Sequence, residues 1–106
     1  ADVIYVPTDN TAASNTEAIA NVTVPAKTPV IAGEEGICKG CGVATLSISY
    51  YDLGMTTGKM AAKILTGEAD ISTMPIEFTT ATPKYNASMC ETLGITPREG
   101  YTAIAE

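Results

Sequence analysis

The sequence contains no histidine and only six basic residues, and these two shortages weigh against several classes of function. Without histidine the chain has no Ser–His or Cys–His catalytic pair, and a zinc site would have to use cysteine and carboxylate ligands alone. Nucleic-acid affinity comes largely from clustered Lys and Arg. Here the basic residues are scattered and outnumbered by twelve Asp and Glu, for a formal net charge of −6. Triad hydrolases, zinc centres and nucleic-acid surfaces are therefore disfavoured.

Longer patterns are absent as well. No apolar run approaches the ~20 residues of a membrane-spanning helix, and the first residues do not read as a signal peptide. The P-loop, G-x-S-x-G and G-x-G-x-x-G motifs do not occur. The chain opens directly on a strand-like stretch, ADVIYV, without an initiator Met, so we expect a mature, truncated or proteolysed piece of a longer protein. The 106 residues, 45% apolar and 17% charged, suit one globular domain.

Strand-like and helix-like segments alternate along the chain, which predicts an α/β fold. Residues 3–6 are an unbroken β-branched and aromatic run, typical of a strand covered on both faces. The patterns predict further strands at 28–33, 43–49 and 73–80, and helices at 11–22, 52–66 and 87–93. We expect Gly67 to end the second of these helices, and Asn86 and Gly94 to cap and end the third, before an irregular tail. With short connections, this order indicates a Rossmann-like or flavodoxin-like parallel sheet flanked by helices.

The chain's cysteine motif, C-x-x-C, lies in the glycine-rich stretch 34–42, which reads as a loop between two strands. Cys38 and Cys41 could be a redox dithiol, part of a metal site with Cys90, a local disulfide, or two free thiols. A thioredoxin-like dithiol normally places its first cysteine at a helix N-terminus, and a loop does not offer one. A disulfide between Cys38 and Cys41 in an exported protein and two free thiols are the favoured alternatives.

A second group of polar residues follows the first strand. Thr8, Asp9 and Asn10 lie at the carboxyl end of that strand and just before a helix, where open α/β sheets bind ligands. Asp9 could pair with an ammonium group, and helix N-terminal amides could hold a carboxylate, as a zwitterion requires. The same residues could instead only cap the helix and shape the turn. Both readings stay open.

Five stretches, taken together, resemble a known family. In order they are ADVIYVPTDNT, TPVIAGEEG, GVATLSISYYDLGMTTGKMAAKILTGE, MPIEF and ETLGI. They are similar to the C-terminal third of substrate-binding proteins of ABC importers, of the type I periplasmic-binding-protein class. Within that class they resemble the branch associated with tryptophan, tyrosine and phenylalanine uptake.

The resemblance implies two Rossmann-like lobes that close over a ligand in the cleft between them. It implies that residues 1–42 and 73–80 belong mainly to one lobe, that 43–67 can cross to the other, and that 81–106 form a C-terminal helix and tail. The ligand-binding residues it implies are Thr8, Asp9, Asn10, Glu34, Ser49 and Tyr50.

By the same resemblance the protein is not an enzyme and uses no cofactor or metal. It would be an extracytoplasmic receptor, periplasmic or anchored as a lipoprotein, that delivers an amino acid to the permease of an ABC importer. A missing N-terminal part of the same protein would complete it. The competing hypothesis is a small flavodoxin-like redox or regulatory domain that uses Cys38 and Cys41.

Overall fold

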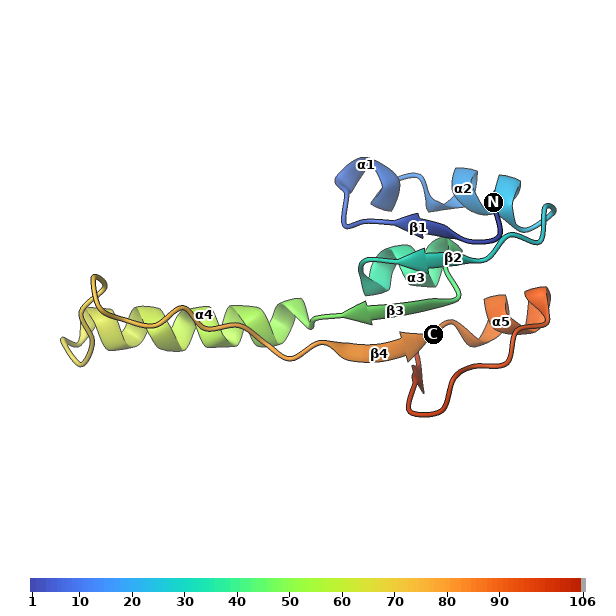
Figure 1. Cartoon of the computed structure of the whole chain (residues 1–106). Helices are drawn as coiled ribbons and strands as arrows, with labels where there is room; N and C mark the ends of the chain where they lie inside the picture. Colours follow the sequence, from blue (N-terminus) through green and yellow to red (C-terminus); the bar gives the residue numbers. More distant parts are fainter. Residues whose placement is uncertain (106) are drawn as a thin grey trace. The chain divides into compact units, whose positions relative to one another are not determined.

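A computed structural model describes residues 1–105, which form two compact units. The first unit comprises Ala1–Ser47 together with the chain from Thr82 onward, and the second is Ile48–Ala81 (Figure 1). The stretch 73–80, which the family resemblance assigns mainly to the lobe of residues 1–42, is part of the second unit.

The first unit is built on a five-stranded sheet, which confirms the predicted α/β class. Its strands, in spatial order, are β1 (Ile4–Val6), β2 (Val30–Ala32), β3 (Ala44–Ser47), β4 (Thr82–Tyr85) and β5 (Thr102–Ala103). Its helices are α1 (Asn10–Ala13), α2 (Thr16–Thr23), α3 (Glu35–Cys41) and α5 (Ala87–Leu93). The strand pairs are parallel except for β3 with β4. That pair is antiparallel because the chain leaves the sheet through β3 and returns through β4.

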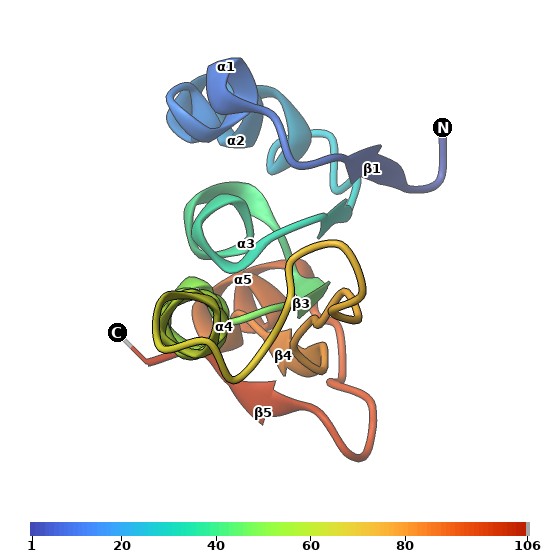
Figure 2. The same ribbon diagram turned by 90° about the vertical axis from the view of Figure 1, so that its left-hand side faces the viewer.

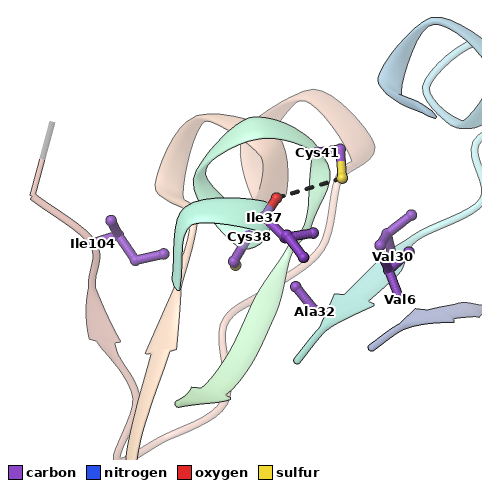
Figure 3. Packing of buried hydrophobic residues seen from close by; sticks show 7 residues of the cluster. All are labelled: Val6, Val30, Ala32, Ile37, Cys38, Cys41 and Ile104. Carbon is purple, nitrogen blue, oxygen red and sulfur yellow. Dashed lines mark hydrogen bonds between the residues drawn. The ribbon is translucent and has the colours of Figure 1, made fainter. Parts of the chain in front are cut away.

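The core of the first unit lies between the sheet and α3. Figure 2 shows α1, α2 and α3 on one side of the sheet, and we call this side the helix-covered face. There Val30 and Ala32 of β2 pack with Ile37 and Cys38 of α3, and all four are at most 2% exposed (Figure 3). Burial of these side chains is the main force that fixes α3 on the sheet.

The predicted helix 11–22 is divided into α1 and α2. Two polar side chains at the division bond back to the preceding turn: Ser14 Oγ donates to Asn10 O at 2.8 Å, and Asn15 Nδ2 donates to Thr11 O at 2.8 Å. Such local bonds compete with the continuing helix ladder, which explains why one apolar pattern gives two short helices.

The prediction of a loop at residues 34–42 is wrong, because this stretch contains α3. Glu34 is its N-cap, and the capping hydrogen bonds offset the presence of Gly36 in the first turn. Ile37, Cys38 and Cys41 lie on its buried side. The helical spacing of these apolar residues outweighs the low helix propensity of the glycines.

The second unit contains α4 (Tyr50–Leu65), two residues longer at its start than the predicted helix. It ends as expected at Gly67, which has a φ of +81°. The predicted strand 73–80 is absent from the structure. Its alternating residues Ile76 and Phe78 are 93% and 85% exposed, since no other strand in this unit pairs with them.

The C-terminal region matches the prediction for α5, which begins after the cap Asn86 and ends at Gly94 with a φ of +68°. The tail, predicted to be irregular, supplies the short strand β5. Within residues 1–105 no helix combines the length and apolar character needed to cross a membrane.

Candidate functional site

The carboxyl ends of β1 and β2 bring two loops into direct contact. Thr8 Oγ1 donates to Gly33 O at 3.2 Å, and Gly33 N donates to Val6 O at 2.8 Å. A Cβ at Gly33 would lie 2.8 Å from Thr8 N, so the close approach of the two backbones requires glycine here. Four predicted residues, Thr8, Asp9, Asn10 and Glu34, therefore flank one edge of the sheet. We call it the carboxyl edge.

Asp9 caps α1, as one of the two readings of the sequence predicts. Its backbone is extended, and its Oδ1 accepts a hydrogen bond from Ala12 N at 2.8 Å. Oδ2 makes no hydrogen bond within residues 1–105, and the side chain is exposed. Asn10 is the first residue of the helix and is exposed as well. Capping thus occupies one carboxylate oxygen of Asp9 and leaves the other accessible.

Glu34 caps α3 with both of its carboxylate oxygens. Oε2 accepts from Gly36 N at 3.0 Å, and Oε1 accepts from Ile37 N. These two bonds hold the carboxylate in place next to Gly33, although each oxygen keeps a further lone pair. Glu34 is therefore a fixed negative charge beside the loop that carries Asp9.

The carboxyl edge has an unbalanced negative charge. Lys84 Nζ pairs with Glu35 Oε2 at 3.0 Å and neutralises that carboxylate. Within residues 1–105, neither Asp9 nor Glu34 has a basic side chain within the 4.0 Å of a salt bridge. An edge with this charge attracts a cationic group and repels an isolated anion.

Three further residues at this edge were not singled out from the sequence. Gly33 allows the contact between the two loops. Its position directly after a predicted strand is the sequence feature that could have indicated this role. Thr45 and Ser47 of β3 are 1% and 6% exposed and lie on the helix-covered face, since Thr45 pairs in register with Ala32. The Thr45 hydroxyl has no hydrogen-bond partner within the described residues. Alternation in the stretch 43–49 could have indicated this burial.

Ser49 and Tyr50 belong to the second unit. Ser49 Oγ caps α4 by accepting from Asp52 N at 3.2 Å, and Tyr50 begins the helix with its side chain 58% exposed. Their contribution to a ligand site stays a prediction.

The cysteines form no disulfide: Cys38, Cys41 and Cys90 are all free and buried. Of the two alternatives favoured from the sequence, the structure has the free thiols and not a disulfide between Cys38 and Cys41, which both lie on the buried side of α3. Burial, reinforced by the neighbouring thiols of Cys90 and Cys41, raises the pKa of Cys38 to about 12.

A thiol with so high a pKa is a poor nucleophile, and Cys38 lies well inside α3, not at its N-terminus. The Cys41 thiol is also engaged, 3.4 Å from Ile37 O (Figure 3). Among the described residues no group of three or more Cys, Asp or Glu could hold a metal ion. The environment of the cysteines is that of a packed core.

Comparisons with known proteins agree on one class of protein. The family model described as ABC transporter substrate binding protein matches residues 1–106. A tyrosine-binding protein of Clostridioides difficile (strain R20291) is 38% identical over 68 residues, which are 64% of this chain and 20% of that protein.

Two solved structures share the fold over almost the whole chain. A ligand-free, open substrate-binding protein with adhesive properties from Clostridium difficile is 34% identical, with a TM-score of 0.76, covering 96% of this chain and 35% of that one. An ABC domain in complex with L-Trp from Streptococcus pneumonia is 31% identical, with a TM-score of 0.80, covering 97% of this chain and 37% of that one. The chain thus spans little more than a third of these structures.

Proposed function

Because the chain belongs to the family of ABC transporter substrate-binding proteins, we propose that it forms part of an extracytoplasmic receptor for a small zwitterion. The ligand is an aromatic amino acid, which the complete receptor passes to the permease of an ABC importer. Residues 1–106 supply one side of the ligand site, and the remaining part of the same protein supplies the other. The family is one of binding proteins, which supports a role without catalysis.

The observation that carries this proposal is the carboxyl edge itself. Asp9 and Glu34 each follow directly after one residue of the Thr8–Gly33 contact, and neither has a basic partner within residues 1–105. The free Oδ2 of Asp9 accepts from the ammonium group of the ligand. Glu34, whose oxygens are already bonded to its own helix, contributes a fixed charge.

The carboxylate of the ligand needs donors, and the side-chain amide of the exposed Asn10, next to Asp9, is one. The Thr8 hydroxyl already donates its hydrogen to Gly33 O, so Thr8 shapes the loop beside Asp9. Closure of the complete receptor around the ligand excludes water, which strengthens these polar contacts and favours the closed form that a permease recognises.

The aromatic class of ligand is supported by two relatives. One is named a tyrosine-binding protein, and the other was solved in complex with L-Trp. The family also supports an extracytoplasmic location for the complete protein, and we propose a periplasmic protein or a membrane-anchored lipoprotein.

The test is calorimetric titration of L-tryptophan and L-tyrosine into the full-length polypeptide that carries these residues. Asp9→Asn keeps the helix cap, because Asn and Asp cap equally well, but it removes the charge. We expect Asp9→Asn to weaken binding by roughly 2–5 kcal/mol, the cost of losing one partner of a desolvated charge pair. Asp2→Asn, at an exposed position before β1, is the matched control and should bind like the wild type. Equal affinities of Asp9→Asn and the wild type would refute the role of Asp9.

A further inference from the structure

The strand that brings the chain back from the second unit contacts α3 through two polar side chains. Lys84 lies in β4, and Asn86 follows this strand directly. Asn86 N donates to Val43 O at 2.9 Å, so the pairing of β4 continues one step beyond its end. Because side chains alternate along an extended backbone, Lys84 and Asn86 project to the same side of the sheet, the helix-covered face.

Lys84 contacts the first turn of α3. Its Nζ lies 3.0 Å from Oε2 of Glu35, which is the first residue of the helix and directly follows the cap Glu34. The side chains of Lys84 and Glu35 are 32% and 40% exposed, so solvent screens their attraction only in part. This is the one salt bridge within residues 1–105, and it ties β4 to the residue next to Glu34.

Asn86 contacts the last turns of α3. Its Nδ2 donates to Cys38 O and to Lys39 O, both at 3.1 Å. These carbonyls lie where the regular hydrogen bonds of a helix run out and outside donors are needed. The Asn86 side chain is buried, and its Oδ1 caps α5 by accepting from Met89 N at 3.0 Å. One buried amide therefore joins the ends of two helices to the end of β4.

The position of α3 depends on such contacts because the helix is short. Seven residues, two of them glycine, do not form a stable helix by themselves. Burial of apolar side chains holds α3 against the sheet, but apolar burial is non-directional. The polar contacts of Lys84 and Asn86, one near each end, determine where the helix lies along its own axis. Glu34 is the cap of this helix, so its position follows that of α3.

We propose that Lys84 and Asn86 are positioning residues of the ligand site, which hold Glu34 at the carboxyl edge by fixing both ends of α3. Neither residue has to touch the ligand. The chain leaves the first unit after β3 and returns to it through β4. The position of Glu34 is therefore tied to the strand that follows the second unit. The inference rests on the proposed function in taking Glu34 as part of the ligand site.

The test compares two substitutions that break the salt bridge but change the charge in opposite directions. Lys84→Met removes a positive charge and Glu35→Gln removes a negative one. Calorimetric titration of L-tryptophan into the full-length polypeptide measures the effect of each. If the pair positions Glu34, both substitutions should weaken binding by about 3-fold or more. A change in the electrostatic field at the ammonium group alone would instead tighten binding in Lys84→Met and weaken it in Glu35→Gln.

Further variants show whether the effect passes through Glu34. Lys84→Arg can still pair with Glu35 and should restore binding. In a Glu34→Ala background, Lys84→Met should cost no further affinity, because the residue that it positions is gone. Asn86→Ser keeps an N-cap for α5 but lacks the amide donors to α3, so it should weaken binding as Lys84→Met does. Lys39→Met is the matched control, because Lys39 is an exposed lysine of α3 without a salt bridge within residues 1–105.

Opposite shifts of affinity in Lys84→Met and Glu35→Gln, or the affinity of the wild type in both, would overturn the proposal. An equal loss in Lys39→Met would overturn it as well, because that lysine contacts neither β4 nor Glu35 through a salt bridge. If Asn86→Ser does not fold, as judged by circular dichroism, the variants of the salt bridge decide.

A second measurement does not depend on the ligand. Glu34 accepts hydrogen bonds from the amides of Gly36 and Ile37, and exchange of these amide hydrogens should be at least ~3-fold faster in Lys84→Met than in the wild type. If the wild type binds neither L-tryptophan nor L-tyrosine, the proposed function fails and the exchange rates alone decide on the positioning role. Equal exchange in the two proteins would overturn that role.

Discussion

The substitution Gly33→Ala tests whether the two loops of the carboxyl edge are packed as closely as the structure shows. The new Cβ would lie 2.8 Å from Thr8 N and 3.1 Å from Pro7 C. Both neighbours are backbone atoms, which cannot rotate away as a side chain could. The loops must separate, which also weakens the hydrogen bond between Gly33 N and Val6 O, now 2.8 Å long.

Overpacking of this kind costs about 1–3 kcal/mol, and with urea m-values of about 1–3 kcal/mol/M the unfolding midpoint should fall by about 1 M. Gly58→Ala is the matched control, because a Cβ at Gly58 meets nothing within 4 Å. Alanine there should stabilise α4 by up to about 1 kcal/mol, since glycine has a low helix propensity. The assay is urea denaturation of residues 1–106 followed by circular dichroism. If Gly33→Ala were as harmless as Gly58→Ala, the contact between the loops would be refuted.

Two other predictions concern the buried helix α3. Glu34→Ala removes the acceptor for two backbone N–H groups and should lower the free energy of unfolding by about 1 kcal/mol, and an unchanged urea midpoint would argue against the cap. Cys38 should be inert to a thiol reagent in the native state at pH 8 and react in urea, and native reactivity equal to that in urea would contradict its burial. Folding raises the pKa of the Cys38 thiol from 9.0 to about 12. The contribution of the protonated thiol to the free energy of unfolding is therefore complete below pH 9 and is lost as the pH rises toward 12. Urea denaturation at several pH values measures this loss.

Local signals in the sequence predicted the elements that depend on nearby residues. Asn86 and Gly94 bound α5, and Gly67 ends α4, because caps and positive-φ glycines act over one helical turn. Asp9 was also a correct N-cap prediction for α1. These features need no information about distant parts of the chain.

The predictions of secondary structure failed where contacts between distant parts of the chain determine the structure. The stretch 34–42 is rich in glycine but folds as α3, because Ile37 and Cys38 are buried against β2. The residues 73–80 alternate like a strand, but a strand also needs a partner, and the second unit offers none. Neither β4 nor its direction was predicted, since both depend on the return of the chain from the second unit to pair with β3.

At the carboxyl edge, the sequence located Thr8, Asp9, Asn10 and Glu34 after the strands that position them. It did not predict that both oxygens of Glu34 would be used by its own helix, since α3 itself was not foreseen. The part of Ser49 and Tyr50 in a ligand site stays a prediction, since only the family resemblance implies it.

The most direct test of the receptor hypothesis is a calorimetric cycle on the full-length polypeptide. The wild type and Asp9→Asn are each titrated with L-tryptophan and with 3-indolepropionate, which lacks the ammonium group. If Asp9 binds the ammonium, removal of either partner should weaken binding at least ~30-fold, and removal of both should cost little more than one removal. Failure of the wild type to bind L-tryptophan or L-tyrosine, or equal binding of both titrants by the wild type, would contradict the account.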